Sequence, residues 1–265
     1  MRNCLITEEQ LNFLLDNGAA CIKEEKGGID IRMKVLAELI YDKSLEYSAE
    51  NKASFIISAQ DLNRFQDYIV FSEPLRIIIG QLKGASSAAY NFVNGKDVIY
   101  LDITKFRSKD FAIPLILHEL THMVHHGKTG NTGIFQFTSK NSPKDIAKIN
   151  RYMYYFNSDE MQARICQYYY YCQLNTPLPP LSPDMDKITN IINIKRAIKD
   201  VKNNLNIAVL FSCALRRSFG KKPMDAGNFM KNGHSSLISY MEKRYQIYFG
   251  KLMKIYKHFS SQKLS

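Results

Sequence analysis

Two stretches decide the fold of this chain: Ser87-Ala-Ala-Tyr-Asn-Phe-Val-Asn-Gly-Lys-Asp-Val-Ile-Tyr-Leu-Asp-Ile103 and, further on, Ile113-Pro-Leu-Ile-Leu-His-Glu-Leu-Thr-His-Met-Val-His-His126. In the first, Asn94-Gly95 separates two strand-like runs, which is the strongest short-range signal for a β-hairpin. In the second, the residues before His118 are apolar on every side of a helix over 110–126, so we expect that helix to be buried. A hairpin followed by a buried helix predicts an α+β fold.

The rest of the chain is mainly helical in its periodicity. Apolar residues at helical spacing predict helices at about 7–28, 31–47, 143–174, 186–219 and 235–260. A β-branched run at about 75–82 predicts one more strand. We therefore expect a mainly helical α+β fold with a small antiparallel sheet. The Pro-rich segment 177–183 separates a basic helical C-terminal part from the rest.

Composition excludes several classes of protein. With 265 residues and 45% hydrophobic content, the chain is too apolar for general disorder and long enough for one large or two small domains. No apolar run approaches 18 residues, so we expect no transmembrane segment. The five cysteines lack CxxC spacing and are expected to be reduced thiols. The first residues do not resemble a secretory signal, which predicts a cytoplasmic protein; virion association and non-classical export are the alternatives.

The basic residues are unevenly distributed. Of 36 Lys and Arg, 16 lie in residues 187–265, which contain only three acidic residues. This segment predicts a basic surface for an anionic partner, either nucleic acid, an acidic protein or a membrane surface. The alternative is a solvated face whose lysines keep the protein soluble. Amphipathic stripes at 188–198 and 238–255 indicate that the segment folds into helices.

The buried helix carries the motif with the clearest chemistry, His118-Glu-Leu-Thr-His122. Four residues turn a helix by about 400°, so the imidazoles of His118 and His122 point the same way, one turn apart, and can share one metal ion. Glu119 lies about 100° further round, which suits a base that acts on metal-bound water. Polar side chains on a buried helix need partners, and a metal ion provides them.

The third ligand of such a site has two candidates. His125 lies seven residues after His118, but a helix rarely directs three successive turns at one tetrahedral ion. Glu160 is the stronger candidate, because a small residue, Ala163, follows three positions later and allows the two helices to come close. The alternative role for Glu160 is a surface ion pair with Arg164 at i+4.

These residues resemble the gluzincin group of zinc metallopeptidases, which combine HExxH on one helix with a glutamate on a later helix, often within ExxA. The resemblance covers about residues 75–175 and rests on His118, Glu119, His122, Glu160 and Ala163. It implies Zn²⁺ as cofactor, with the two histidines and Glu160 as ligands and Glu119 as the general base. It also implies a Tyr or His that stabilises the oxyanion, for which the sequence leaves four candidates: His126, Tyr154, Tyr155 and His234.

Together with the helical patterns on either side of it, the resemblance leads us to expect three regions: an N-terminal helical region at 1–74, a zincin-like metal-site core at 75–176 and the basic helical region at 184–265. In gluzincins an edge strand pairs with extended substrate, and here that strand is expected to be Ser86–Phe92 or its hairpin partner. One position departs from the thermolysin-like pattern, since Arg164 stands where that pattern has an aspartate.

The sequence therefore favours a zinc-dependent metallopeptidase that hydrolyses protein or peptide substrates. The alternative is a structural or interaction protein with a peptidase-like fold, for example a phage virion component that docks through its basic C-terminal helices. The charge distribution motivates this alternative, whereas the HExxH motif favours the enzyme.

Overall fold

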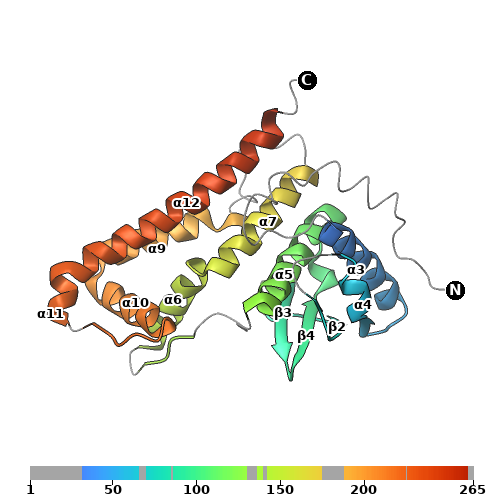
Figure 1. Ribbon diagram of the computed structural model, residues 1–265, viewed down its shortest axis with the longest axis horizontal. Coiled ribbons are helices and arrows are strands. Elements are labelled where there is room, and N and C mark those ends of the chain that lie inside the picture. Colours follow the sequence, from blue (N-terminus) through green and yellow to red (C-terminus); the bar gives the residue numbers. More distant parts are fainter. Residues whose placement is uncertain are drawn as a thin grey trace. The chain divides into compact units, whose positions relative to one another are not determined.

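The computed structural model describes residues 32–65, 70–84, 86–129, 136–139, 142–174, 188–224 and 226–261. The predicted first helix and the Pro-rich segment lie outside these residues. Contacts group the described residues into two compact units, one drawn from 1–132 and 162–176, the other from 133–161 and 177–265. The fold is mainly helical with one four-stranded sheet, as expected (Figure 1). The predicted three-region division stays a prediction.

The sheet belongs to the first unit and has the order β1-β2-β4-β3. Its strands are β1 (Ser54–Ile57), β2 (Leu75–Ile79), β3 (Ala88–Val93) and β4 (Lys96–Leu101). The expectation of an antiparallel sheet was wrong for one pair, because β2 and β4 run parallel. The chain leaves β2, forms β3 at the edge, and returns by the hairpin to place β4 between them. Strand β1, which pairs with β2, was not predicted.

The predicted hairpin between β3 and β4 is confirmed. The two strands are antiparallel, and Val93 is paired with Lys96 across a two-residue turn. Asn94 has φ 51° and Gly95 has φ 79°. Two successive positive φ angles are what a type I′ turn requires, which explains why Asn-Gly occupies these positions. The hairpin leaves β3 at the edge of the sheet, hydrogen-bonded to β4 alone among the described strands.

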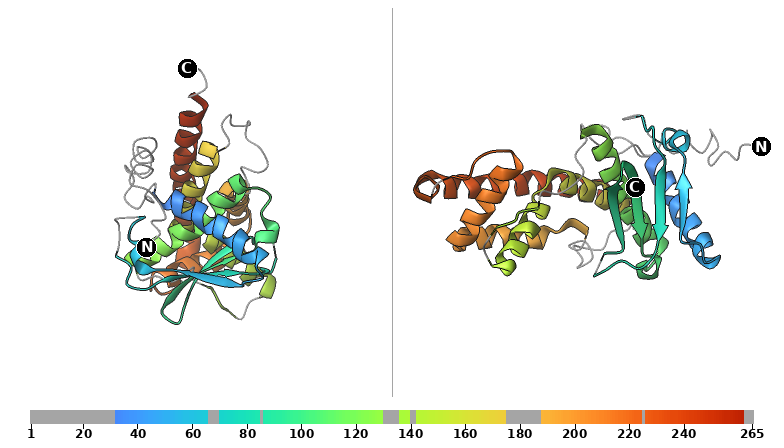
Figure 2. Two further views of the ribbon diagram at one scale, coloured as in Figure 1. Left: turned by 90° about the vertical axis from the view of Figure 1, so that its right-hand side faces the viewer. Right: turned by 90° about the horizontal axis from the view of Figure 1, so that it is seen from below.

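Two helices cover one face of the sheet, α3 (Arg32–Ala49) and α5 (Lys109–Thr129), which correspond to the predictions at 31–47 and 110–126 (Figure 2). Two short elements lie in the connections: α4 (Ala59–Leu62) between β1 and β2, and the 3₁₀ turn η1 (Ile103–Lys105) between β4 and α5. Alternate strand residues bury their side chains, among them Phe55, Ile77 and Ile99. The core therefore lies between the sheet and α5, which is the helix that carries the HExxH motif.

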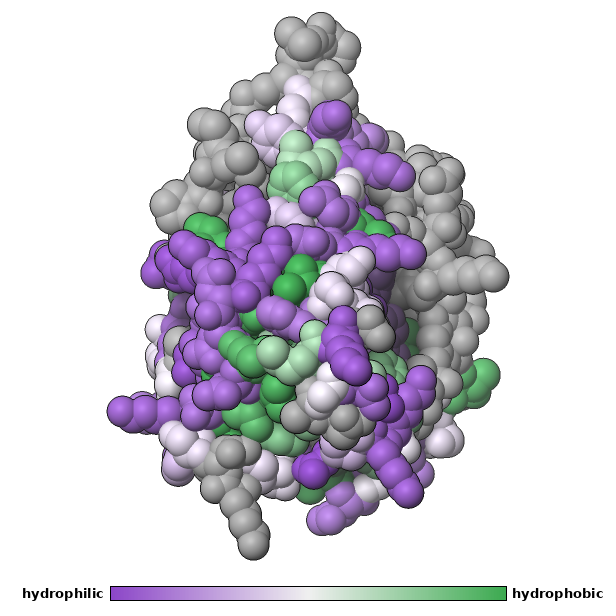
Figure 3. Space-filling model, turned by 90° about the vertical axis from the view of Figure 1, so that its left-hand side faces the viewer, coloured by the Kyte–Doolittle hydropathy of each residue, from purple (hydrophilic) through white to green (hydrophobic). Residues whose placement is uncertain are grey.

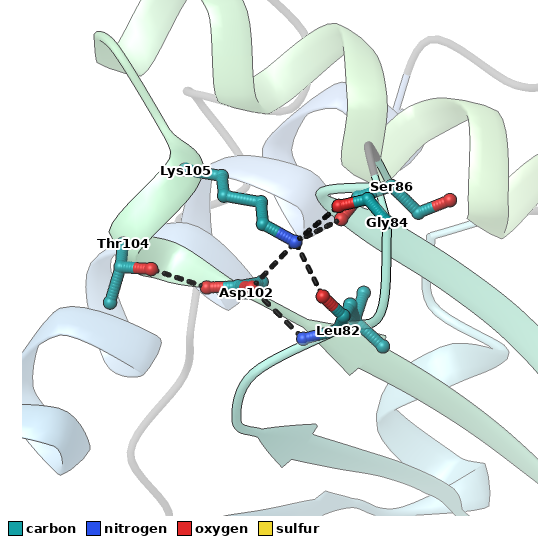
Figure 4. A network of polar contacts seen from close by, with 6 residues as sticks. All are labelled: Leu82, Gly84, Ser86, Asp102, Thr104 and Lys105. Carbon is teal, nitrogen blue, oxygen red and sulfur yellow. Dashed lines mark hydrogen bonds and ion pairs between the residues drawn. The ribbon is translucent and has the colours of Figure 1, made fainter.

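The loop that leads into β3 is fixed by one lysine (Figure 4). The ammonium group of Lys105 donates to the carbonyl oxygens of Leu82, Gly84 and Ser86 and forms an ion pair with Asp102 at 3.0 Å. Asp102 also accepts hydrogen bonds from the hydroxyl of Thr104 and the backbone N–H of Leu82. These bonds fix the backbone immediately before the edge strand.

The hydrogen bonds to Asp102 make a prediction about acid stability. The bond from Thr104, followed by those from Leu82 and Lys105, lowers the pKa of the Asp102 carboxyl from 3.8 to about 2. Because the folded pKa lies below the unfolded one, the stabilisation is complete above about pH 4 and is lost as the pH falls through about 2. We expect Asp102→Asn to lower the free energy of unfolding at pH 6, and the difference from wild type to shrink between pH 4 and pH 2.

Urea unfolding followed by circular dichroism across this pH range tests the expectation. Asp42→Asn is the control, because Asp42 forms an exposed ion pair with Lys109 and such pairs contribute little. A difference between wild type and Asp102→Asn that stays constant from pH 6 to pH 2 would contradict the prediction.

The second unit is helical in its described residues. It contains α6 (Pro143–Tyr155), α9 (Ile191–Asn203), α10 (Leu205–Ser218), α11 (Ala226–Asn228), the π-helical turn η2 (Phe229–Gly233) and α12 (His234–Ser261). The single helix predicted at 186–219 was wrong, because Asn204 ends α9 and its side chain caps α10 by accepting from Ile207 N–H. Throughout the described residues, no helix combines the length and apolar composition needed to span a membrane.

Candidate metal centre

Helix α5 places two imidazoles side by side. Its apolar residues are buried, including Ile116, Leu117 and Leu120, which fixes the orientation of the helix against the sheet. His118 is 6% exposed, and its Nε2 atom lies 3.1 Å from Nε2 of His122. Both nitrogens therefore face the same point beside the helix, as the four-residue spacing predicts.

Glu160 lies on the first turn of α7 (Ser158–Leu174), a separate helix. The prediction of a single helix at 143–174 was wrong, because helix α6 ends at Tyr155 and a new helix begins at Ser158. Asn157 begins the new helix, since its side-chain oxygen accepts hydrogen bonds from the backbone N–H groups of Asp159 and Glu160. The cap fixes the first turn of α7 and with it the position of Glu160, which is 2% exposed.

The three residues predicted as ligands come together. His118, His122 and Glu160 each offer one ligand atom, and these atoms all lie within 4.8 Å of one another. A tetrahedral zinc site with Zn–N bonds of about 2.0 Å holds its nitrogens about 3.3 Å apart, close to the 3.1 Å between the two Nε2 atoms. Two imidazoles and a carboxylate also match the ligand types of catalytic zinc sites. The donor set fits zinc, and the role of these residues as ligands stays a prediction.

A second contact links α5 to α7 next to the cluster. Cys166 is hydrogen-bonded to Thr121, which lies between the two histidines in the sequence, and Ala163 is fully buried one turn before it. Burial raises the pKa of the Cys166 thiol to about 12, although the Thr121 bond opposes the shift. The thiol is therefore protonated at neutral pH, and the cluster has a His, His, Glu donor set without a thiolate.

The proposed base, Glu119, is held by the edge strand. Its Oε2 atom accepts a hydrogen bond of 2.7 Å from the backbone N–H of Tyr90, and the side chain is 8% exposed. Tyr90 is paired with Ile99 of β4; its N–H points away from β4, because it is bonded to Glu119. The carboxylate therefore lies against the outer edge of β3.

Neither family models, nor curated proteins, nor solved structures match this chain. The function of the cluster must therefore be argued from its own geometry.

The side chain of Tyr90 ties β3 to α5 through a network that the sequence did not reveal. The hydroxyl donates to Oδ1 of Asp97 at 2.6 Å and lies 2.8 Å from Nδ1 of His126. A hydroxyl has one proton, so His126 must carry a proton on Nδ1 and donate it to the tyrosine oxygen. Desolvation, followed by the Asp97 bond, raises the pKa of Tyr90 far above its ordinary value. The hydroxyl therefore stays protonated and keeps donating to Asp97, and its contact with His126 links β3 to α5.

Tyr90→Phe tests this network. The change leaves the buried Asp97 carboxylate without its donor and His126 without its acceptor, so we expect a loss of about 1–3 kcal/mol in the free energy of unfolding. Urea unfolding measures the loss. Tyr100→Phe on the neighbouring strand is the matched control and should change the free energy of unfolding much less. Equal effects of the two substitutions would contradict the network.

The four residues that the sequence offers for stabilising the oxyanion do not lie in one place along the fold. The four oxyanion candidates divide between the units, with only His126 in the first. The rings of Tyr154 and Tyr155 contact each other, and Nε2 of His234 lies 2.9 Å from the carbonyl oxygen of Val201. The assignment among these four candidates stays open.

Proposed function

We propose that this chain is a zinc-dependent metallopeptidase with a zincin-like core, in which His118, His122 and Glu160 hold the metal. The observation that carries the proposal is the convergence of the three side chains, from two helices, within 4.8 Å of one another. The position of Glu119 next to His118 in the sequence adds to it, because hydrolysis needs a base near the metal. An antiparallel edge strand, β3, upstream of the HExxH helix accords with the edge strand that the gluzincin resemblance implies.

The residues of the chain supply the proton transfers. Zinc held by His118, His122 and Glu160 would supply Lewis-acid activation of the scissile carbonyl and of a water molecule. Glu119 accepts the proton of the attacking water, whose oxygen forms the new bond to the carbonyl carbon. The same carboxyl then donates the proton to the amide nitrogen as the C–N bond breaks, so that an amine leaves. The Tyr90 N–H holds the carboxylate in place before the substrate arrives.

The free edge of β3 supplies a place for the substrate backbone. The N–H of Tyr90 points away from β4 and is already bonded to Glu119, but alternation along an antiparallel strand gives the backbone groups of Ala88 and Phe92 the same outward orientation. An extended peptide can therefore add to β3 as a further strand beside Glu119. Main-chain pairing of this kind favours extended protein or peptide segments as the substrate class.

Metal removal tests the proposal. Purified native protein is expected to contain about one zinc per chain and to cleave peptides in a proteome-derived library. Treatment with 1,10-phenanthroline should abolish cleavage, and added Zn²⁺ should restore it, because three protein ligands leave one position for water. Cleavage that persists in metal-free protein would refute the zinc mechanism, and native protein without zinc would refute the metal centre.

A further inference from the structure

The helices of the second unit have a large excess of positive charge. The described residues of 188–261 contain 14 Lys and Arg but only two acidic residues, Asp200 and Glu242. Each of the two acids already pairs with a lysine: Asp200 lies 2.6 Å from Lys148, and Glu242 lies 2.5 Å from Lys202. The segment therefore has many more cationic side chains than carboxylates that could neutralise them.

Helix α12 directs its charge to one side. Its apolar residues are buried, as the sequence predicted: Met241, Tyr245, Tyr248, Leu252 and Ile255. Lys243, Lys254 and Lys257 are exposed on the opposite side, since these positions share one face at 100° per residue. At a rise of about 1.5 Å per residue they span about 21 Å along the helix axis. No ion pair engages these three lysines within the described part of the chain.

Helix α9 extends the charge beside α12. The two helices pack along each other (Figure 1), and the ammonium of Lys195 lies over the stacked rings of Tyr245 and Phe249 at 5.7 and 6.0 Å. Arg196 and Lys199 on α9 are exposed. We call the five exposed cationic residues the basic face: Arg196, Lys199, Lys243, Lys254 and Lys257.

Figure 3 looks at the side of the molecule where α11 and the start of α12 lie. Hydrophilic side chains cover most of what it shows, and the hydrophobic ones gather in small areas between them. The exposed apolar side chains of this unit include Ile192, Phe219 and Ile247, so it is the charged residues that indicate the kind of partner.

We propose that the basic face binds the phosphate backbone of a nucleic acid. A regular array of phosphates complements a group of cations whose two acidic neighbours, Asp200 and Glu242, are already paired with lysines. A membrane-bound amphipathic helix would have to bury its apolar side in lipid, but the apolar side of α12 is buried within its own unit. Protein interfaces are depleted of charge at their centre and rich in aromatic residues, whereas the exposed side of α12 has three lysines beside one exposed apolar residue, Ile247.

The charge count sets the expected salt dependence. If five phosphates are neutralised, log K should fall against log salt with a slope of about −4.5 for duplex DNA and about −3.5 for a single strand. The binding should not depend on base sequence, because contacts with phosphates carry none of that information. It should also not depend on zinc, because the basic face contains none of the proposed ligands.

The test uses the full chain and fluorescein-labelled 30-mers, one duplex DNA and one single-stranded RNA, with binding followed by anisotropy from 50 to 300 mM NaCl. The variant Lys243→Gln/Lys254→Gln/Lys257→Gln should bind at least 100-fold more weakly at 50 mM salt, and its duplex slope should fall by about 2.7. The control variant Lys83→Gln/Lys96→Gln/Arg107→Gln removes three exposed cations from the first unit and should bind as wild type does.

Three outcomes would overturn the proposal. The first is no binding to either nucleic acid at 50 mM salt, and the second is an equal loss of affinity in both triple variants. The third is preferential binding to vesicles of 30% phosphatidylserine, with the basic-face variant losing vesicle binding alone, which would assign the surface to a membrane. Far-ultraviolet circular dichroism and thermal unfolding establish that each variant is folded, since all six positions are exposed.

Discussion

Glu119→Gln is expected to retain about one zinc per chain while its rate of peptide cleavage falls by about 10³-fold. Glutamine has nearly the same shape as glutamate, and its amide oxygen can still accept the hydrogen bond from Tyr90 N–H. The amide cannot accept and return a proton, however, and general acid–base catalysis contributes about 10²–10⁴-fold to such reactions. Metal analysis and kcat/KM on one identified cleavage site would measure the two effects separately.

The control for this substitution is Glu73→Gln, which removes an exposed carboxylate of the same unit. It should leave both zinc content and cleavage unchanged. Glu119→Gln protein that cleaves as fast as wild type would remove Glu119 from the mechanism. Loss of zinc from the same variant would instead indicate that Glu119 helps to hold the metal.

The second large effect is expected from Glu160→Gln, which should weaken zinc binding about a hundredfold. Structural zinc sites bind with about 10–16 kcal/mol through four ligands, or about 3 kcal/mol per ligand, and about 1.4 kcal/mol corresponds to a factor of ten. The amide keeps the volume of a side chain that is only 2% exposed, so the fold should survive. Competition with a fluorescent zinc chelator measures the change in affinity.

Two neighbouring substitutions make this test specific. Asp159→Asn removes a carboxylate from the same turn of α7, and His125→Ala removes the other histidine that the sequence offers as a third ligand. Neither should change zinc affinity, because the ligand cluster consists of His118, His122 and Glu160. A hundredfold loss in His125→Ala with none in Glu160→Gln would reverse the assignment of the third ligand.

The parts of the site that could be predicted are those that depend on local periodicity. His118 and His122 face one point because four residues make about one helical turn, and Asn94-Gly95 forms a turn because both residues tolerate positive φ. The sequence identified Glu160 through its spacing to Ala163. It did not predict that a separate helix begins at Ser158. The capping bonds of Asn157 interrupt a run of residues whose helical propensity is continuous.

The parts that could not be predicted depend on contacts between distant residues. The position of β4 between β2 and β3 is a matter of strand order, which side-chain alternation does not encode. The bond from Tyr90 to Glu119 uses a backbone N–H, and nearly every residue has such a group. What sets the Tyr90 amide apart is that the Tyr90 side chain is bonded to Asp97 and His126, which hold the strand against α5. These residues lie up to 36 positions apart in the sequence.

The lysine beneath the edge strand has a consequence for any experiment with chelators. Three carbonyl oxygens and one carboxylate oxygen surround the ammonium group of Lys105. Oxygen ligands of these kinds are also those that a hard metal ion such as calcium takes. Here the cation is covalently attached to the chain, so no chelator can extract it. We therefore expect the loop before β3 to keep its shape in metal-free protein, so that a change caused by chelation would report on the histidine and glutamate cluster.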